Sequence, residues 1–326
     1  MRRSNRRDFC RTLAGGAAGL SLAYRLPNAF GQPVQGAAST ISVAKITDTF
    51  TLLTGAGSNV LLLTQPEGAL LVDGGTAERS ADLLKTVADL SGGKPVQALF
   101  NTCWHMDNTG SNDTLGKAGI KIVAHENTKL WMSTEFHVQW QNKTYKPRAK
   151  EARPNDTFYT TAKMNFGKEE IQYGWLGQAN TDGDIFVFFP GPNILVTGDV
   201  FTVGKYPVLD WSTGGWMGSY NDTTKQPVGG VAEACYTLAK IGDLQTRVIP
   251  GRGPVQSRPD FQAHTDMCTT MAQRFRDMMR KGMSAGDMFR SAPTKDFDAK
   301  YGDPQQFIAN AYPGMWNHVR ELGGIV

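Results

Sequence analysis

NTCWHMDNTG, residues 101–110, places a cysteine, a histidine and an aspartate at alternate positions of one short loop. The apolar run at 96–101 predicts a strand that leads directly into this loop. Thiolate, imidazole and carboxylate groups are the side chains that bind zinc in proteins. Cys103, His105 and Asp107 therefore make the loop the first candidate for a metal-binding or catalytic site.

Short apolar runs also precede this loop. Three of them lie between residues 50 and 72, and turns that contain glycine or proline separate them. This spacing predicts antiparallel strands that end at residues 73–75. A helix is expected at 80–90, because leucine and valine side chains recur there at helical spacing.

Downstream of the loop, strand and helix patterns continue along the chain. Residues 137–156 are polar, basic and aromatic with little periodicity, which indicates a surface insertion. A long aromatic loop is expected at 201–225. Two sheet-rich halves each end in strand–loop–helix units, which predicts an α/β sandwich with its loops along one edge. The expected elements are helices at 110–116 and 126–136, and strands at 120–124, 156–161, 169–174, 185–189, 194–197 and 247–249.

Five motifs occur in a fixed order along the chain: residues 73–75, 101–112, 179–184, 197–199 and 250–254. Together they make the chain resemble the metallo-β-lactamase superfamily of zinc hydrolases. The resemblance covers roughly residues 45–260. It implies an α/β fold, a four-layer αββα sandwich at 39–260, with a C-terminal helical extension at 261–326.

The resemblance also implies a set of metal ligands. In the superfamily, positions 103, 105, 180 and 199 would hold one zinc ion, and positions 107, 108, 252 and 199 the other. His105, Asp107 and Asp199 keep the expected residue types. Four positions depart from the usual histidine: Cys103, Asn108, Asn180 and Arg252. An aspartate at 199, where many β-lactamases have cysteine, points toward the glyoxalase-like branch.

The second metal position is predicted to be degenerate. Besides Asp107 and Asp199 it would contain Asn108 and Arg252. An amide oxygen is a poor zinc ligand, and a guanidinium does not lose its proton. Two carboxylates that face one pocket are costly to bury without a counter-charge. We therefore predict that Arg252 pairs with both carboxylates and stands in for the missing cation.

The first metal position leaves two interpretations open. Cys103, His105 and Asp199 are all zinc ligands, and Asn180 or water would complete one four-coordinate site. Only if that metal is bound would Asp107 serve as a general base toward water. A cysteine sulfur reaches less far than a histidine ring, so the alternative is a free thiol at the rim of a hollow, with His105 hydrogen-bonded to Asp199 or solvent. We accordingly expect no metal or at most one zinc.

Other residues near the motifs have supporting roles. The resemblance implies that Asp73 orients the metal-binding loop rather than touching metal. A set of aromatic and methionine side chains in the loops predicts an apolar wall for a small apolar ligand. These residues are Trp104, Met106, Tyr206, Trp211, Trp216 and Tyr220.

The first 38 residues differ from the rest of the chain. They hold a twin-arginine pattern at 6–11 and an apolar stretch at 13–23 that is too short to span a bilayer. We interpret 1–38 as a twin-arginine (Tat) signal peptide with candidate cleavage after Ala29 or Ala38, which predicts a periplasmic or secreted protein.

Removal of this segment changes the charge balance. It holds six of the 34 basic residues and one of the 30 acidic residues, which leaves 28 basic and 29 acidic residues. A near-neutral chain argues against a nucleic-acid partner or a membrane partner after cleavage. Three cysteines remain, an odd number that excludes a complete disulfide framework. Cys235 and Cys268 lie on helical apolar stripes and are expected to be small core residues.

Three functions are consistent with these residues. The first is an exported metallo-β-lactamase-fold pseudoenzyme, with an eroded dinuclear zinc site, that binds a small ligand or a partner. The second is a mononuclear zinc hydrolase of esters, thioesters or lactones that uses Cys103, His105 and Asp199. The third is an interaction protein that uses the 137–156 insertion.

Overall fold

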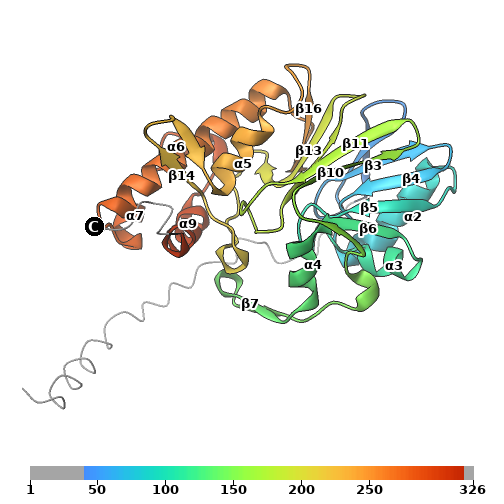
Figure 1. Cartoon of the computed structure of the whole chain (residues 1–326), viewed down its shortest axis with the longest axis horizontal. Helices are drawn as coiled ribbons and strands as arrows, with labels where there is room; N and C mark the ends of the chain where they lie inside the picture. The colour runs from blue at the N-terminus through green and yellow to red at the C-terminus, as the bar shows by residue number, and fades with distance from the viewer. Residues whose placement is uncertain (1–39, 319–326) are drawn as a thin grey trace, which may run out of the picture. The chain divides into compact units, whose positions relative to one another are not determined.

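The apolar runs that flank the loop at 101–110 form the first sheet. The structure, a computed structural model shown in Figure 1, describes residues 40–318. The sheet has the order β1-β2-β3-β4-β5-β6-β9, antiparallel from β1 to β4 and parallel from β4 to β9. Its strands are β1 (Ser42–Lys45), β2 (Phe50–Thr54), β3 (Val60–Gln65), β4 (Gly68–Val72), β5 (Val96–Phe100), β6 (Lys121–His125) and β9 (Asp156–Phe158).

A second sheet follows, in the order β10-β11-β12-β13-β16. Its last two strands are parallel and the other neighbours antiparallel. The chain crosses from the first sheet to the second within two residues, between Phe158 and Thr161. The strands are β10 (Thr161–Phe166), β11 (Glu169–Trp175), β12 (Ile185–Phe189), β13 (Ile194–Thr202) and β16 (Arg247–Arg252).

Three apolar clusters separate four layers. The middle cluster joins both sheets and includes Leu61 and Val72 of the first and Val187 and Val196 of the second. On one outer face the first sheet packs against α2 (Ser80–Leu90) and α3 (Asn112–Lys117), and on the other the second sheet packs against α5 (Gly230–Leu238) and α6 (Arg258–Arg280) (Figure 1). β3 and β4 are apolar on both faces because each face meets another layer. The predicted four-layer αββα sandwich is therefore confirmed.

Most predicted elements are present, with differences at their ends. The helix at 80–90 is α2, and the helix expected at 126–136 is the shorter α4 (Glu126–Ser133). The single strand expected at 156–161 is instead the whole of β9 and the first residue of β10. β10 was missed because its residues alternate between exposed and half-buried at an edge of the sheet.

The 137–156 segment is an insertion with its own small hairpin. Strands β7 (Phe136–Val138) and β8 (Lys143–Tyr145) pair around the 3-10 turn η2 (Gln139–Gln141), and η3 (Lys150–Ala152) follows. The hairpin packs on Trp104 of the 101–110 loop through a fourth apolar cluster. The insertion is thus tied to the loop rather than standing free on the surface.

The aromatic segment expected at 201–225 contains structure that the sequence did not predict. It holds the 3-10 turn η4 (Trp211–Thr213) and the strand β14 (Ser219–Asn221), which pairs with β15 (Gln226–Val228). Both β14 and β15 lie against α6. This region therefore connects the loop edge to the C-terminal helices.

The C-terminal helices share the core of the second sheet. α6 begins at Arg258, where Ser257 and Asp260 form a capping box, so the expected boundary at 261 falls inside the first turn of this helix. α9 (Gln305–Asn317) contributes Phe307 and Ile308 to the cluster that contains β13. The remaining helices are α7 (Ala285–Arg290) and α8 (Asp298–Tyr301), and η1 (Ala77–Arg79) precedes α2.

Two sequence predictions concern other parts of the chain. The segment predicted to be a signal peptide, 1–38, lies outside the described residues, as does the end of the extension after residue 318. Among residues 40–318, no helix combines the length and the apolar character that crossing a bilayer requires.

Candidate functional site

The loop that carries Cys103, His105 and Asp107 is held at its start by Asp73. The backbone N–H and the hydroxyl of Thr102 donate to the two carboxylate oxygens of Asp73, at 2.8 and 2.7 Å. Burial raises the pKa of Asp73 to about 8, against the Thr102 hydrogen bonds, which lower it. These contacts match the orienting role that the resemblance implied for Asp73.

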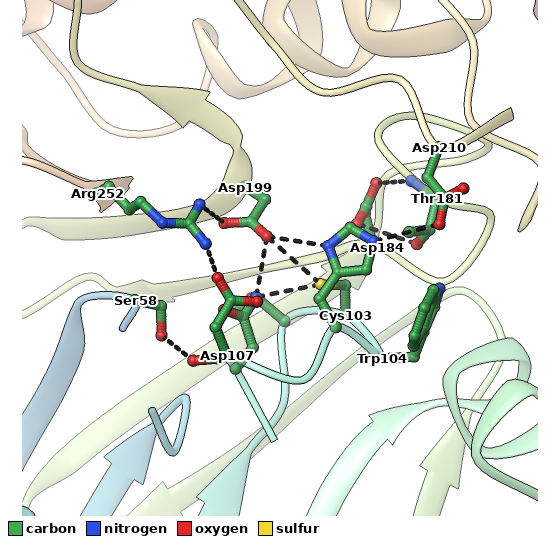
Figure 2. A network of polar contacts seen from close by, with 12 residues as sticks. Ser58, Cys103, Trp104, Asp107, Thr181, Asp184, Asp199, Asp210 and Arg252 are labelled. Atoms are coloured by element: carbon green, nitrogen blue, oxygen red, sulfur yellow. Dashed lines mark hydrogen bonds and ion pairs between the residues drawn. The ribbon is translucent and has the colours of Figure 1, made fainter. Parts of the chain in front are cut away.

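Asp199 enters the site from an irregular point of β13. The register between β13 and β16 shifts on both sides of Gly198, which has φ 59°. A Cβ on Gly198 would lie 2.7 Å from the Thr102 side chain, so only glycine permits both this backbone and this approach of the loop. The irregularity places Asp199, which is 6% exposed, beside the loop (Figure 2).

Arg252 lies between the two carboxylates of the predicted second metal position. Its Nη1 is 3.2 Å from Asp199 Oδ1, and its Nη2 contacts Asp107 Oδ2, as Figure 2 shows. Burial lowers the pKa of Arg252, but a guanidinium keeps its charge in proteins. The predicted pairing is present, so a fixed cation bridges these two acids and offsets one of their two negative charges.

The other oxygen of Asp199 faces the predicted first metal position. Asp199 Oδ2 lies 3.2 Å from His105 Nδ1, 3.3 Å from Asn108 Nδ2 and 3.8 Å from Cys103 Sγ. Asn108 Nδ2 also donates to Cys103 Sγ at 3.1 Å. Asn108 therefore presents a donor to this cluster, not a ligand oxygen.

His105 is held between two carboxylates, one of which the sequence did not single out. Its Nε2 is 3.4 Å from Asp210 Oδ2, opposite the contact with Asp199. Burial lowers the pKa of His105, but Cys103 and the two hydrogen-bonded carboxylates raise it well above its ordinary value. An imidazolium that donates from both nitrogens fits this arrangement and adds a second positive charge to the site.

Asp210 ties the insertion to this network. It is fully buried, accepts from Thr213 Oγ1 at 2.8 Å and accepts from Trp140 Nε1 of η2 at 2.8 Å. One sequence signal could have found it, because Asp210 is the only acid between positions 200 and 221. A lone acid in a long apolar loop needs partners if it is buried.

Cys103 is a free thiol, but it does not lie at a rim. It is fully buried, and burial raises the pKa of the thiol to about 12, against His105, which lowers it. The rim position expected from the sequence is therefore wrong, because the loop folds inward over the sulfur. A protonated thiol is a weak nucleophile, so the geometry gives no support to cysteine catalysis.

Asn180 has the least satisfied side chain at this edge. It is fully buried, and neither its amide oxygen nor its amide nitrogen has a hydrogen-bond partner among residues 40–318. Its backbone oxygen accepts from the N–H of Asp210, at 2.9 Å. A buried amide without a hydrogen-bond partner lowers stability. A ligand that binds the Asn180 side chain would explain why this amide is retained.

These side chains fit one zinc ion and do not fit two. The sulfur of Cys103, a ring nitrogen of His105 and a carboxylate oxygen of Asp199 lie within 4.8 Å of one another, as the donors of one zinc ion would. Arg252 places a guanidinium between Asp107 and Asp199, the carboxylates that a second ion would need. A dication there would be repelled by that charge.

The predicted apolar wall is not formed. Tyr206 stacks on Phe307 of α9, Trp216 stacks on His318, and Tyr220 packs beside Arg276 of α6. This part of the prediction is wrong for Tyr206 and Trp216, because the C-terminal helices cover these two rings and bury them in their own interface. Trp211 lies half-buried in η4.

Trp104 and Met106 line a different hollow, next to the insertion. Six further residues complete it: Trp131, Met132, Phe136, Tyr145, Lys146 and Arg148. The Trp104 ring packs edge-to-face on Phe136 and Tyr145. The hollow is therefore apolar at its base and has two basic side chains in its lining.

Comparison with known proteins places the chain in a family. A structure of a metallo-β-lactamase from Pontibacter korlensis is similar, with a TM-score of 0.54 and 18% sequence identity over 70% of this chain and 98% of that chain. The crystal structure of the DIM-1 metallo-β-lactamase is also similar, with a TM-score of 0.52 and 16% identity over 72% of this chain and 99% of that chain. At such identities the likeness shows the fold alone. The sequence model of the metallo-β-lactamase superfamily matches residues 53–247, more than half of the chain, and the chain therefore belongs to this superfamily.

Proposed function

We propose that this chain is a pseudoenzyme of the superfamily, which binds a small organic ligand and does not hydrolyse substrates through two zinc ions. The observation that carries the proposal is the contact of Arg252 with both Asp107 and Asp199. Two-metal hydrolysis uses both ions to hold and polarise the reacting groups. A guanidinium supplies charge at that place but no coordination position, so the two-metal route is lost.

The hollow beside the loop suggests the chemistry of the ligand. Trp104, Trp131 and Phe136 give it an apolar base, and Arg148 adds positive charge. The ammonium of Lys146 is paired with Glu135 at 2.6 Å, so an acidic ligand would have to displace that carboxylate. Apolar surface with a few convergent polar groups is typical of small-molecule sites. The hollow has room for about one water molecule (≈ 10 Å³), so a ligand would enter only as these side chains move apart. A small apolar carboxylic acid would place its hydrocarbon part on the rings and its carboxylate near the two cations.

Metal analysis combined with turnover tests the loss of the dinuclear site. The chain is purified, equilibrated with excess zinc, desalted and analysed for zinc per chain, and lactone, ester and thioester hydrolysis is measured. We expect at most one zinc per chain and no zinc-dependent turnover. Two zinc ions per chain with zinc-dependent hydrolysis would contradict the proposal.

Ligand binding is tested separately. Thermal shifts are measured with a series of apolar acids and with their neutral amides, for the chain and for a Lys146→Ala, Arg148→Ala double variant. We expect stabilisation by the acids that the double variant and the amides lose. Equal shifts for acid and amide would contradict the role of the cations.

One observation favours a second candidate function, a mononuclear zinc hydrolase. Cys103, His105 and Asp199 would hold the ion with Asn180, whose buried amide is otherwise unpartnered. Bound zinc would supply Lewis-acid chemistry there. Asp107, the general base expected for this case, is engaged by Arg252 and would have to leave that contact to act.

The Cys103→Ala variant separates the two functions. A mononuclear enzyme requires about one zinc per chain as isolated, and loss of both the zinc and the hydrolysis in this variant. Zinc that stays bound in Cys103→Ala would show that the first position is not the site.

We also propose export through the twin-arginine route. The support is the pattern at 6–11 and the apolar stretch at 13–23. Cell fractionation tests it. We expect the chain outside the cytoplasm, and we expect the variant in which Arg6 and Arg7 are both replaced by lysine to stay in the cytoplasm. An unchanged distribution would contradict export by this route.

A further inference from the structure

A second cysteine–histidine cluster lies far along the sequence from the loop, between two helices. Cys235 comes from α5, and His264 and Cys268 come from successive turns of α6. Their donor atoms lie within 4.8 Å of one another, with 4.0 Å between the two sulfurs and 3.5 Å between Cys268 Sγ and His264 Nε2. The spacing of four residues places the imidazole and the second thiol on one face of α6.

This cluster is closed off from solvent and surrounded by apolar side chains. Cys235 and Cys268 are 0% exposed and His264 is 1% exposed, inside the core that joins the second sheet to the C-terminal helices. Phe201 and Phe261 lie against the imidazole. The three groups have no carboxylate among them, so they form a soft donor set without a hard ligand.

The histidine of this cluster is not explained by packing. His264 Nδ1 is buried and has no hydrogen-bond partner among residues 40–318, while Nε2 faces Cys268 Sγ and the carbonyl oxygen of Val200 at 3.2 Å. A buried nitrogen without a partner lowers stability, and an apolar ring would fill the same space without that cost. The nitrogen that faces the second thiol is Nε2, so Nε2 is the ring atom that would bind a ligand, in exchange for its contact with the Val200 carbonyl oxygen.

We propose that Cys235, His264 and Cys268 bind one copper(I) ion. Structural zinc sites are almost always four-coordinate, and this cluster offers three side-chain donors in a place where water has no access. Soft sulfur ligands favour monovalent copper, and imidazole also binds it. The site is separate from the Cys103 cluster and does not depend on the proposed function of the loop.

The charge balance of binding suits a dry core. Cu⁺ binds the two cysteine sulfurs and the imidazole, and one thiol proton leaves to solvent. The product is one thiolate, one thiol, one imidazole and one monovalent ion, with no net charge. Burying a neutral assembly avoids the large cost of an unpaired buried charge.

A disulfide is the competing use of the same two cysteines. A disulfide requires about 2.05 Å between the sulfurs, well short of the distance in this structure, and the closed core hinders access of an oxidant. In the proposal both thiols therefore stay reduced. Because a disulfide lowers the mass of the chain by two units, mass spectrometry distinguishes the disulfide from the two reduced cysteines.

The test uses the full chain in a Cys103→Ala background, which removes the thiol of the other cluster. The chain is unfolded, reduced and refolded without oxygen in the presence of a Cu(I)–acetonitrile salt, because the folded core is closed. Refolding is checked by circular dichroism, and copper retained against bicinchoninate is measured per chain. X-ray absorption then reports the sulfur and nitrogen ligands.

We expect about one copper per chain with sulfur and nitrogen coordination. Cys268→Ala and His264→Gln in the same background should each weaken copper retention at least tenfold. His264→Gln keeps a polar side chain of similar reach, so it covers the case in which the cysteine variant does not refold. No retained copper in the refolded chain, retention unchanged by His264→Gln, binding of zinc but not copper, or a mass two units low from a disulfide would each overturn the proposal.

Discussion

The two cysteine–histidine clusters of this chain use similar side chains in opposite environments. The loop cluster of Cys103 and His105 lies among the carboxylates of Asp199 and Asp210 and next to a guanidinium. The helical cluster of Cys235, His264 and Cys268 lies among apolar and aromatic side chains. In the loop cluster, a guanidinium and an imidazole already contact the carboxylates. In the helical cluster, one histidine nitrogen has no partner among residues 40–318.

This difference indicates what each cluster can bind. A dication at the loop edge competes with Arg252 and with a charged His105 for the same oxygens of Asp199. A monovalent soft ion in the helical core competes with no other cation. From the residue types alone, the loop cluster would be the better metal site. The surrounding charges disfavour a second metal ion there, whereas the helical core holds no competing cation among the described residues.

The largest effect is expected when the four departures at the loop are reversed together. Cys103→His, Asn108→His, Asn180→His and Arg252→His in one chain supply the full ligand set and remove the guanidinium. We expect zinc to rise from at most one to two ions per chain, as measured by elemental analysis after desalting. Copper retention by the helical cluster should not change. A chain that folds with these four histidines and still holds no second zinc would contradict the inference that the four departures exclude the second ion.

Removal of the Arg252 charge alone should destabilise the loop edge. Arg252→Ala leaves Asp107 and Asp199 facing each other without a counter-charge, and we expect a loss of about 2–3 kcal/mol in the free energy of unfolding, below the value for a fully buried pair because the arginine is 33% exposed. Urea denaturation measures it. Arg290→Ala, which removes an exposed ion pair with Asp287, is the control, and it should cost much less than Arg252→Ala. Equal losses would show that Arg252 does not carry the charge of the site.

The anchoring of the loop by Asp73 gives the next effect. Asp73→Ala leaves the buried N–H and hydroxyl of Thr102 without an acceptor, which should cost about 2 kcal/mol. Asp73→Asn keeps one acceptor and tolerates the φ of 66° at this position, so it should cost about 1 kcal/mol or less. Urea denaturation of both variants checks the order. An alanine variant as stable as the asparagine variant would show that these hydrogen bonds do not hold the loop.

The sequence predicted the layers and the loop edge because both follow from local patterns. The apolar runs of β3 and β4 and the helical spacing of α2 are visible in the chain itself, and five ordered motifs identified the family. The pairing of Arg252 with both acids also followed once the resemblance had placed these residues in one pocket, since two carboxylates there require a cation.

The parts that the sequence did not predict depend on contacts between distant segments. Tyr206 and Trp216 have the residue types of a pocket wall, but the C-terminal helices cover both rings. Asp210 became a site residue only because η4 and the insertion bring it to His105. The importance of His264 is not visible in the sequence, because it comes from Cys235 on a neighbouring helix.

The smallest effect separates the two environments by one matched substitution. Cys103→Ser places a hydroxyl where Asn108 Nδ2 can donate to it and Asp199 can accept from it, so we expect a loss of about 1 kcal/mol or less. Cys235→Ser places the same hydroxyl among apolar side chains with Cys268 and His264 as its polar neighbours, and we expect about 1–3 kcal/mol. Urea denaturation of the reduced chain without copper measures both. If the serine at 103 cost more than the serine at 235, the loop edge would be the drier of the two sites, and the assignment of a soft monovalent ion to the helical core would lose its physical basis.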